Sequence, residues 1–125
     1  MTHKMKDSGK RKHFDTGAVR ENAPDKGRYD LISPIMLHRL AIVMEKGGKK
    51  YCDRNWEKGM PLHRYLDAAL RHTYQRLEGM IDEDHIVQAI ANLMFFVHTE
   101  EMIKRGVLPK ELDDLPNYLI KEKEK

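Results

Sequence analysis

Two stretches with helical periodicity lie only a few residues apart, and this spacing constrains the fold more than any other feature of the sequence. The first keeps apolar residues at helical intervals: Leu62, Tyr65, Leu66, Ala69, Leu70, Thr73 and Leu77. The second, over residues 83–104, does the same, and the residues predicted on its core side are Ile86, Ile90, Leu93, Met94 and Val97. Gly79 suits a helix end and Asp82 a helix start. Helices joined by so short a turn pack antiparallel, which predicts an all-α fold built on a helical hairpin.

A further helix is predicted upstream of this hairpin. Ser33 suits the N-cap position and Pro34 the first helical position. An apolar stripe then follows at helical spacing: Leu37, Leu40, Ala41 and Met44. Gly47 and Gly48 are predicted to stop this helix, and a polar loop follows it as far as Pro61. No convincing pair of strands is evident, so the prediction remains all-α.

Charge and apolar content divide the chain into three parts. Residues 1–30 hold eight Lys/Arg against five Asp/Glu, whereas residues 31–125 hold fifteen of each. We predict a flexible basic arm over residues 1–27, a helical domain over residues 28–110 and a charged tail over residues 111–125. The neutral body, without a basic helix face, argues against nucleic acid as the partner.

The cysteine count and the apolar runs bear on location. Cys52 is the only cysteine, so no intrachain disulfide can form, which fits a reducing cytoplasm. The longest apolar run, residues 93–97, is far too short to span a bilayer. The basic N-terminus has no apolar stretch behind it, unlike a secretory signal. We therefore expect a cytoplasmic protein with no membrane partner.

A polar stripe borders the apolar face of the last predicted helix. His85, Gln88 and Asn92 share one helix face. The preceding helix has a comparable polar side: Asp67, Arg71, His72, Gln75 and Glu78. Folding the two helices about residue 81 brings His72 close to the stripe. Buried polar groups need partners, so this seam is either a structural hydrogen-bond network or a ligand site between helices.

Residues 82–85, Asp-Glu-Asp-His, form the densest acidic cluster in the sequence. Oxygen-rich clusters suit Mg²⁺ or Mn²⁺, although acids that open a helix also serve simply to match its dipole. Glu45 and Glu78 are predicted to converge on the same end of the hairpin. One cysteine and no H-x₃-H pair argue against structural zinc, and Gly47-Gly48-Lys49-Lys50 lacks the spacing of a phosphate-binding Walker loop.

Trp56 is the only tryptophan, and its neighbours in the sequence are polar. A large aromatic side chain is costly to leave in water, so it must cover something. Either the indole seals the junction between the first two helices, or it stacks on a purine base while Asn55 reads the edge of that base. The residue types alone do not decide between these roles.

Six short motifs occur in a specific order: F-D-T-G-A (14–18), K-G-R-Y-D-L (26–31), E-K-G-G-K-K-Y (45–51), R-N-W-E-K-G (54–59), R-Y-L-D-A-A-L-R-H (64–72) and D-E-D-H (82–85). Together they resemble the phage-type dATP/dGTP diphosphohydrolase family over residues 14–98. That family is grouped with the MazG-like all-α pyrophosphatases. The resemblance implies a helical bundle that uses Mg²⁺ or Mn²⁺ to cleave a purine dNTP to dNMP and pyrophosphate. It also implies a homodimer or homotetramer, acting in the host cytoplasm if the chain is phage-encoded.

The resemblance and the residue types together suggest roles for individual side chains. The candidates for water orientation or catalysis are Glu45, Asp67 and His72. The candidates for nucleotide binding are Lys26, Arg28, Lys49, Lys50, Tyr51, Arg54, Asn55, Trp56 and Arg71. The candidate metal ligands are Glu45, His72, Glu78, Asp82 and His85.

The chain departs from the broader MazG pattern at the usual metal ligands. Registering on Tyr65-Leu66 places Ala69 and His72 at the two acids of the E-x-x-E motif. At the two acidic positions of the following E-x-x-D motif, this chain has Ala89 and Asn92. Negative charge must then come from elsewhere, the choices being Glu45, Asp67, Glu78, Asp82 and Asp84. This departure keeps a non-catalytic helical protein, which binds a nucleotide or another partner, as the main alternative. A small nucleic-acid-binding module is the other.

Overall fold

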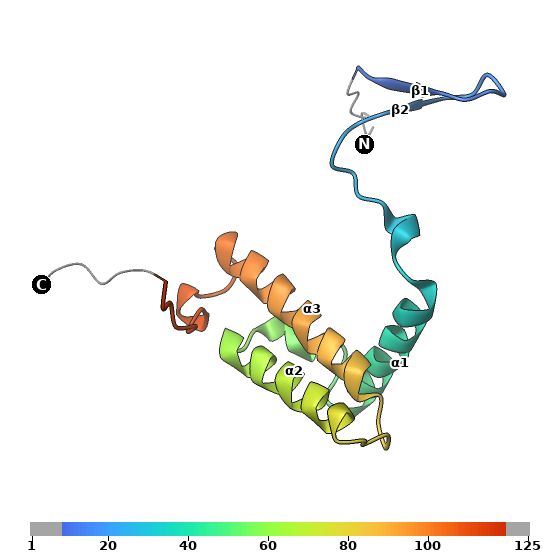
Figure 1. The fold of residues 1–125 in the computed structure, drawn as a ribbon. Helices are drawn as coiled ribbons and strands as arrows, with labels where there is room; N and C mark the ends of the chain where they lie inside the picture. Colours follow the sequence, from blue (N-terminus) through green and yellow to red (C-terminus); the bar gives the residue numbers. More distant parts are fainter. Residues whose placement is uncertain (1–8, 120–125) are drawn as a thin grey trace, which may run out of the picture. The chain divides into compact units, whose positions relative to one another are not determined.

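The computed structural model describes residues 9–119, which divide after Ser33 into an N-terminal unit and a helical unit (Figure 1). The helical unit contains α1 (Pro34–Lys50), α2 (Leu62–Leu77) and α3 (His85–Lys104). Two 3₁₀ turns complete it, η2 (Asn55–Lys58) and η3 (Lys110–Leu112). The all-α prediction is confirmed for this unit, in which α2 and α3 form an antiparallel hairpin with α1 packed on α3. No helix in residues 9–119 is long and apolar enough to cross a membrane.

The N-terminal unit holds a short hairpin that the sequence did not reveal. Strand β1 (Arg11–His13) pairs antiparallel with β2 (Val19–Glu21), so that Lys12 faces Arg20. In the turn, the Phe14 amide donates to the Ala18 carbonyl over 3.0 Å. Three-residue strands that are almost wholly exposed have no apolar alternation, so periodicity could not predict them. A 3₁₀ turn, η1 (Tyr29–Leu31), follows the hairpin.

Helix α1 runs past the two glycines that were predicted to stop it, and this prediction was wrong. Gly47 and Gly48 lie inside the helix, which ends at Lys50. A Cβ atom on Gly48 would lie 2.5 Å from Oδ1 of Asp53, in the loop that follows. A side chain at this position would force the Asp53 carboxylate to turn away, so the glycine lets the following loop pack closely on the helix.

The core forms where α1 and α2 meet α3. Its centre is Leu40, Val87 and Ala91, surrounded by Met36, Val43, Met44, Ile90, Met94 and Phe95. On α2 the buried residues are Leu62, Tyr65 and Ala69, whereas Leu70 and Leu77, which belong to the same apolar pattern, are exposed. On α3, Ile86, Leu93 and Val97 are likewise exposed. Apolar residues are spread around much of α3, so its sequence gave only a weak indication of which face packs inward.

The C-terminal segment is more than a charged tail as far as Leu119. Leu108 and Leu112 lie against Gly59, the residue that ends η2. The His63 amide, in the first turn of α2, donates to Oδ1 of Asp114 over 3.1 Å, and the His63 imidazole pairs with Oδ2. Asp114 therefore caps α2 from far away in the sequence. The end of the predicted tail, residues 120–125, lies outside the described residues.

An ion pair between Arg39 and Asp84 ties α1 to the start of α3. The guanidinium donates twice to the carboxylate, over 2.9 and 2.5 Å. This bond, together with the positive charge of Arg39, holds the pKa of Asp84 below its ordinary value. In the unfolded chain the Asp84 carboxylate binds a proton at a higher pH than it does in the folded protein. The ion pair therefore adds its full contribution to the free energy of unfolding above about pH 4, and this contribution is lost as the pH falls further.

Arg39→Gln is therefore expected to lower the free energy of unfolding at pH 7, and the difference from the wild type should shrink as the pH falls through the lowered pKa of Asp84. Urea unfolding of both proteins at pH 7 and near pH 3.5 measures this convergence. A difference that stayed constant across the two pH values would contradict the assigned role of the pair.

Candidate functional site

Two histidines and an aspartate meet at the turn between α2 and α3. The His85 side chain is almost completely buried in the first turn of α3. Its Nε2 atom lies 2.8 Å from Oδ1 of Asp82, and its Nδ1 atom lies 2.9 Å from Nδ1 of His72 on α2. The two imidazole rings are tilted by 33° with centroids 5.2 Å apart. The predicted approach of His72 to the polar stripe of α3 is therefore found in the structure.

The protonation states of these three residues follow from their contacts. The hydrogen bond from His85 holds the pKa of Asp82 below its ordinary value, so Asp82 is a carboxylate that accepts. His85 therefore donates from Nε2, and in its neutral form the lone pair of Nδ1 faces His72. Burial, and then the nearby His85, lower the pKa of His72. His72 is accordingly neutral at pH 7, the form in which an imidazole binds a metal ion.

Glu83 adds a second carboxylate to this turn. Donor atoms of Asp82, Glu83 and His85 all lie within 4.8 Å of one another. The Gln88 amide donates to Oε1 of Glu83 over 2.9 Å and so fixes the orientation of the carboxylate. Carboxylate oxygens and imidazole nitrogens in such a group fit a divalent cation. We name Asp82, Glu83, His85 and His72 the turn cluster.

Gln75 adds a polar side chain beside the turn cluster. It lies three residues after His72, on the same face of α2. Its side-chain oxygen, Oε1, is buried and interacts with the His72 imidazole, which raises the pKa of His72 and so opposes part of the lowering by burial.

The structure does not bring the other predicted metal ligands to the turn cluster. Glu45 is exposed on α1 and pairs with Lys49 over 3.5 Å. Glu78 is exposed at the C-terminal end of α2. Neither belongs to the group of donor atoms found within 4.8 Å in the described residues, and His72 meets that group only through its contact with His85. Asp67 forms an exposed ion pair with Arg71 over 3.3 Å.

The predicted phosphate-binding residues of the helical unit lie on and after the end of α1. Lys49 and Lys50 close the helix, and the Lys50 ammonium lies 5.2 Å from the centre of the Tyr51 ring. Arg54 adopts a left-handed backbone conformation and pairs with Glu57 over 2.5 Å. These charges are exposed to solvent, as a site for a highly charged nucleotide requires.

Trp56 packs against the protein's own helix α3. The indole stacks on Phe95 with centroids 4.9 Å apart and an 18° angle between the planes. The imidazole of His98 meets it edge-on at 4.8 Å. The Tyr65 hydroxyl donates to the Trp56 carbonyl over 3.3 Å, and Thr99 donates to that hydroxyl over 3.4 Å. One face of the indole is thus already covered, and its role as a base-stacking platform stays a prediction.

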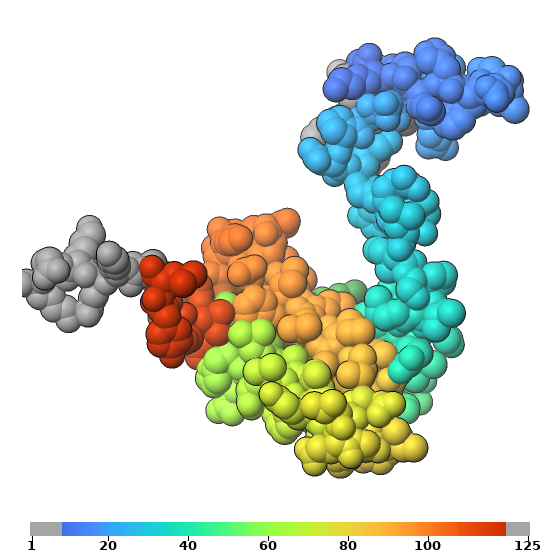
Figure 2. All heavy atoms as spheres, in the orientation of Figure 1, coloured from blue at the N-terminus to red at the C-terminus, as the bar shows by residue number. Residues whose placement is uncertain are grey.

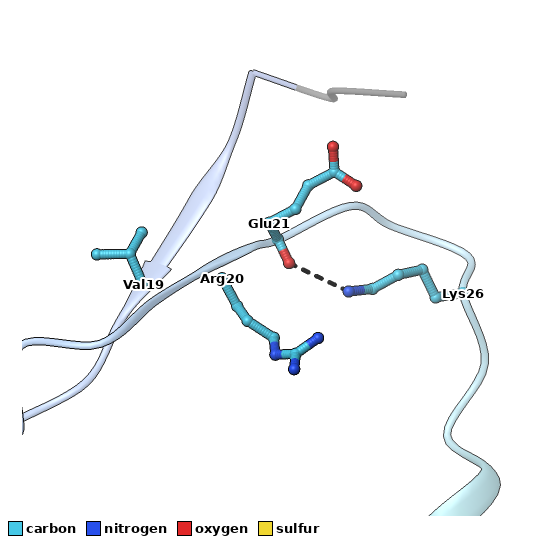
Figure 3. A pocket seen from close by; sticks show the side chains of 4 residues that line it. All are labelled: Val19, Arg20, Glu21 and Lys26. Atoms are coloured by element: carbon cyan, nitrogen blue, oxygen red, sulfur yellow. Dashed lines mark hydrogen bonds between the residues drawn. The ribbon is translucent and has the colours of Figure 1, made fainter. Parts of the chain in front are cut away.

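Lys26 and Arg28, the remaining predicted nucleotide ligands, lie in the N-terminal unit. Lys26 donates to the Glu21 carbonyl over 3.1 Å in a shallow hollow that Val19 and Arg20 also line (Figure 3). Arg28 forms a double hydrogen bond with Asp30, over 2.8 Å in each contact.

Comparison with known proteins identifies the family. A family model described as the N-terminal part of dATP/dGTP diphosphohydrolase matches residues 16–107. This range includes α1, α2 and α3 and therefore the whole turn cluster. No curated protein and no solved structure matches the chain. The matched residues make up most of the sequence. The chain therefore belongs to the dATP/dGTP diphosphohydrolase family.

Proposed function

We propose that this protein hydrolyses purine deoxynucleoside triphosphates, dGTP or dATP, to the monophosphate and pyrophosphate, with Mg²⁺ or Mn²⁺ bound at the turn cluster. The observation that carries the proposal is the meeting of two imidazole rings and two carboxylates inside the matched region. This donor set can hold a divalent cation without the carboxylate quartet of the MazG pattern.

The cation, when bound, neutralises charge on the triphosphate and makes the phosphorus easier to attack. The chain's own residues do the rest. His85 and His72 position the cation, and Asp82 holds His85 in the required tautomer. Lys49, Lys50 and Arg54 are exposed cations for the phosphates. Asp67 and Glu45 are exposed carboxylates, and we assign them to the orientation of water. Arg71 is paired with Asp67, and we assign it to phosphate binding once a phosphate displaces this carboxylate.

Pyrophosphate release from each dNTP and NTP, with Mg²⁺ or with Mn²⁺, tests the proposed activity. We expect release from dGTP or dATP, equimolar dNMP, and far slower release from dCTP and dTTP. Release of orthophosphate alone would contradict cleavage between the α- and β-phosphates. Equal rates with purines and pyrimidines would contradict the proposed base preference.

A second candidate function is nucleotide binding without hydrolysis. In the MazG pattern, acidic residues stand at the positions of Ala69 and Ala89, and in this chain both positions are buried. Neither alanine can bind a metal ion. Tight binding of dGTP with no pyrophosphate release in the assay above would favour this function.

We further propose that the protein is a homodimer or homotetramer that assembles through α3. This helix lies open in Figure 2, and Leu93 and Val97 are 46% and 64% exposed on it. The two residues line an apolar groove along α3 that also includes Ile90, Met94, His98, Glu101, Met102 and Arg105. Exposed apolar helix faces of this kind usually meet a partner.

Val97→Glu is expected to shift the protein to the monomer, because it places a charge in the apolar groove. Light scattering at micromolar protein concentration measures the mass. Val107→Glu is the matched control, since Val107 is similarly exposed, at 67%, but lies beyond α3. A wild-type mass equal to that of one chain would sink the proposal, and so would an unchanged oligomer in Val97→Glu.

A further inference from the structure

We infer that the N-terminal unit carries a site of its own for a triphosphate group. Its cations are Lys12 and Arg20, on opposite strands of the hairpin, and Lys26 in the segment that follows. This site requires neither the turn cluster nor hydrolysis, so it lies outside the proposed function.

The register of the hairpin separates its side chains onto two faces. In an antiparallel pair, directly opposed residues share a face, and so do residues two apart along a strand. Lys12 is directly opposed to Arg20. Their face therefore holds Lys10, Lys12, Phe14, Ala18, Arg20 and Asn22, none of which is acidic. The one acid of the paired strands, Glu21, lies on the other face, opposite Arg11.

The opposed pair of Lys12 and Arg20 is unfavourable without an anion. Like charges at directly opposed positions destabilise the pairing of two strands. Neither side chain has an ion pair or a side-chain hydrogen bond to any of residues 9–119. Arg28, by contrast, is neutralised by Asp30. A multiply charged anion that bridges the two strands removes the repulsion and so stabilises the hairpin.

Arg20 and Lys26 converge on one hollow beside this pair. They line it together with Val19 and Glu21, and in Figure 3 the guanidinium and the ammonium both extend into it. The ammonium is held there by its hydrogen bond to the Glu21 carbonyl over 3.1 Å, and it keeps further N–H donors for a ligand. The guanidinium offers the planar pair of donors that fits a phosphate group.

The number of cations suits one triphosphate group rather than a nucleic acid strand. Each of its three phosphate groups can meet one of Lys12, Arg20 and Lys26. Tight binding of a nucleic acid needs a longer row of contacts, on the order of 6–10 phosphates. Residues 31–125 hold as many acidic as basic side chains, so they add no excess positive charge that could extend the row.

Two-dimensional ¹H–¹⁵N NMR of the full chain, titrated with inorganic triphosphate in the absence of divalent metal ions, tests the inference. We expect saturable shifts of the amides of residues 11–13 and 19–21 and of the Arg20 side-chain N–H. Arg20→Ala and Arg20→Glu should each weaken this binding at least about tenfold. Arg20→Glu keeps the hairpin, because opposite charges then face each other across the strands. Arg11→Ala removes one positive charge from the other face and is the matched control, with an affinity close to that of the wild type.

The possible results separate the inferred site from the proposed function. Hairpin amides that did not respond to triphosphate, or wild-type affinity in Arg20→Glu, would overturn the inference and leave the proposed hydrolase intact. Tighter binding of a single-stranded DNA oligonucleotide than of triphosphate at the hairpin would also overturn it, since the site would then serve a nucleic acid. Triphosphate binding that is lost in Arg20→Glu, in a protein without any dNTP hydrolysis, would support the inference and refute the proposed activity.

Discussion

His85→Ala is expected to lower kcat/KM for dGTP or dATP by at least about 10³-fold, and Asp82→Ala by about 10²-fold, while both variants keep their helical circular dichroism. His85 holds the centre of the turn cluster, with Asp82 on one ring nitrogen and His72 on the other. Its loss removes a ligand and leaves two partners without a hydrogen bond. Asp82 is 61% exposed, so its truncation affects the orientation of His85 more than the packing of the fold.

Matched variants make this result interpretable. His38→Ala removes an exposed histidine from α1 and should leave kcat/KM unchanged. His85→Gln fills the space of the imidazole better than alanine, so it separates loss of activity from loss of packing. Wild-type turnover in both His85→Ala and Asp82→Ala would sink the assignment of the turn cluster to catalysis.

Most of the helical architecture could be predicted from the sequence because local signals agree with it. Pro34 and Pro61 mark the starts of α1 and α2, and Gly79 follows the end of α2. The exact end of α1 could not be predicted, since Gly47 and Gly48 usually mark a helix end but lie inside this helix. The hairpin of the N-terminal unit was missed because its pairing shows no apolar period.

The faces of the helices were harder to predict than the helices themselves. Val97 was assigned to the core and is exposed, while Ala89 and Ala91 are buried. Small residues let helices approach closely, but a helix with apolar residues on several sides carries only a weak amphipathic signal to show which side does so. The register of α3 against α2 and α1 therefore comes from three-dimensional packing.

Only part of the candidate site could be predicted from the sequence. A polar stripe and a short turn were enough to bring His72 and His85 together, because both features belong to one helical hairpin. The place of Glu45 depends on how α1 crosses α3, which no spacing in the sequence encodes. Glu83 stood in the acidic run but was not chosen, because only the Gln88 contact shows that it turns toward the cluster.

Trp56→Ala is expected to lower the free energy of unfolding by about 3 kcal/mol, at the lower end of the range for a truncated aromatic because the indole is only half-buried. The change removes the stack on Phe95 and the edge contact with His98, and so opens the junction between η2 and α3. It also loosens the loop whose carbonyl accepts the Tyr65 hydroxyl. Chemical unfolding followed by circular dichroism measures the loss, and Trp56→Phe, which keeps a stacking ring, should recover much of it.

The same residue permits a sharp test of the alternative, in which the indole stacks on the purine base. Trp56 is the only tryptophan, so its fluorescence reports on this position alone. If its ring serves the core, a non-hydrolysable dGTP analogue should leave the emission almost unchanged. Base stacking predicts a clear shift or quench, together with a loss of about one to two decades in nucleotide affinity and little loss of stability in Trp56→Ala. Because Phe95 already covers one face of the indole, we expect the stability of the fold to change and the emission to remain constant.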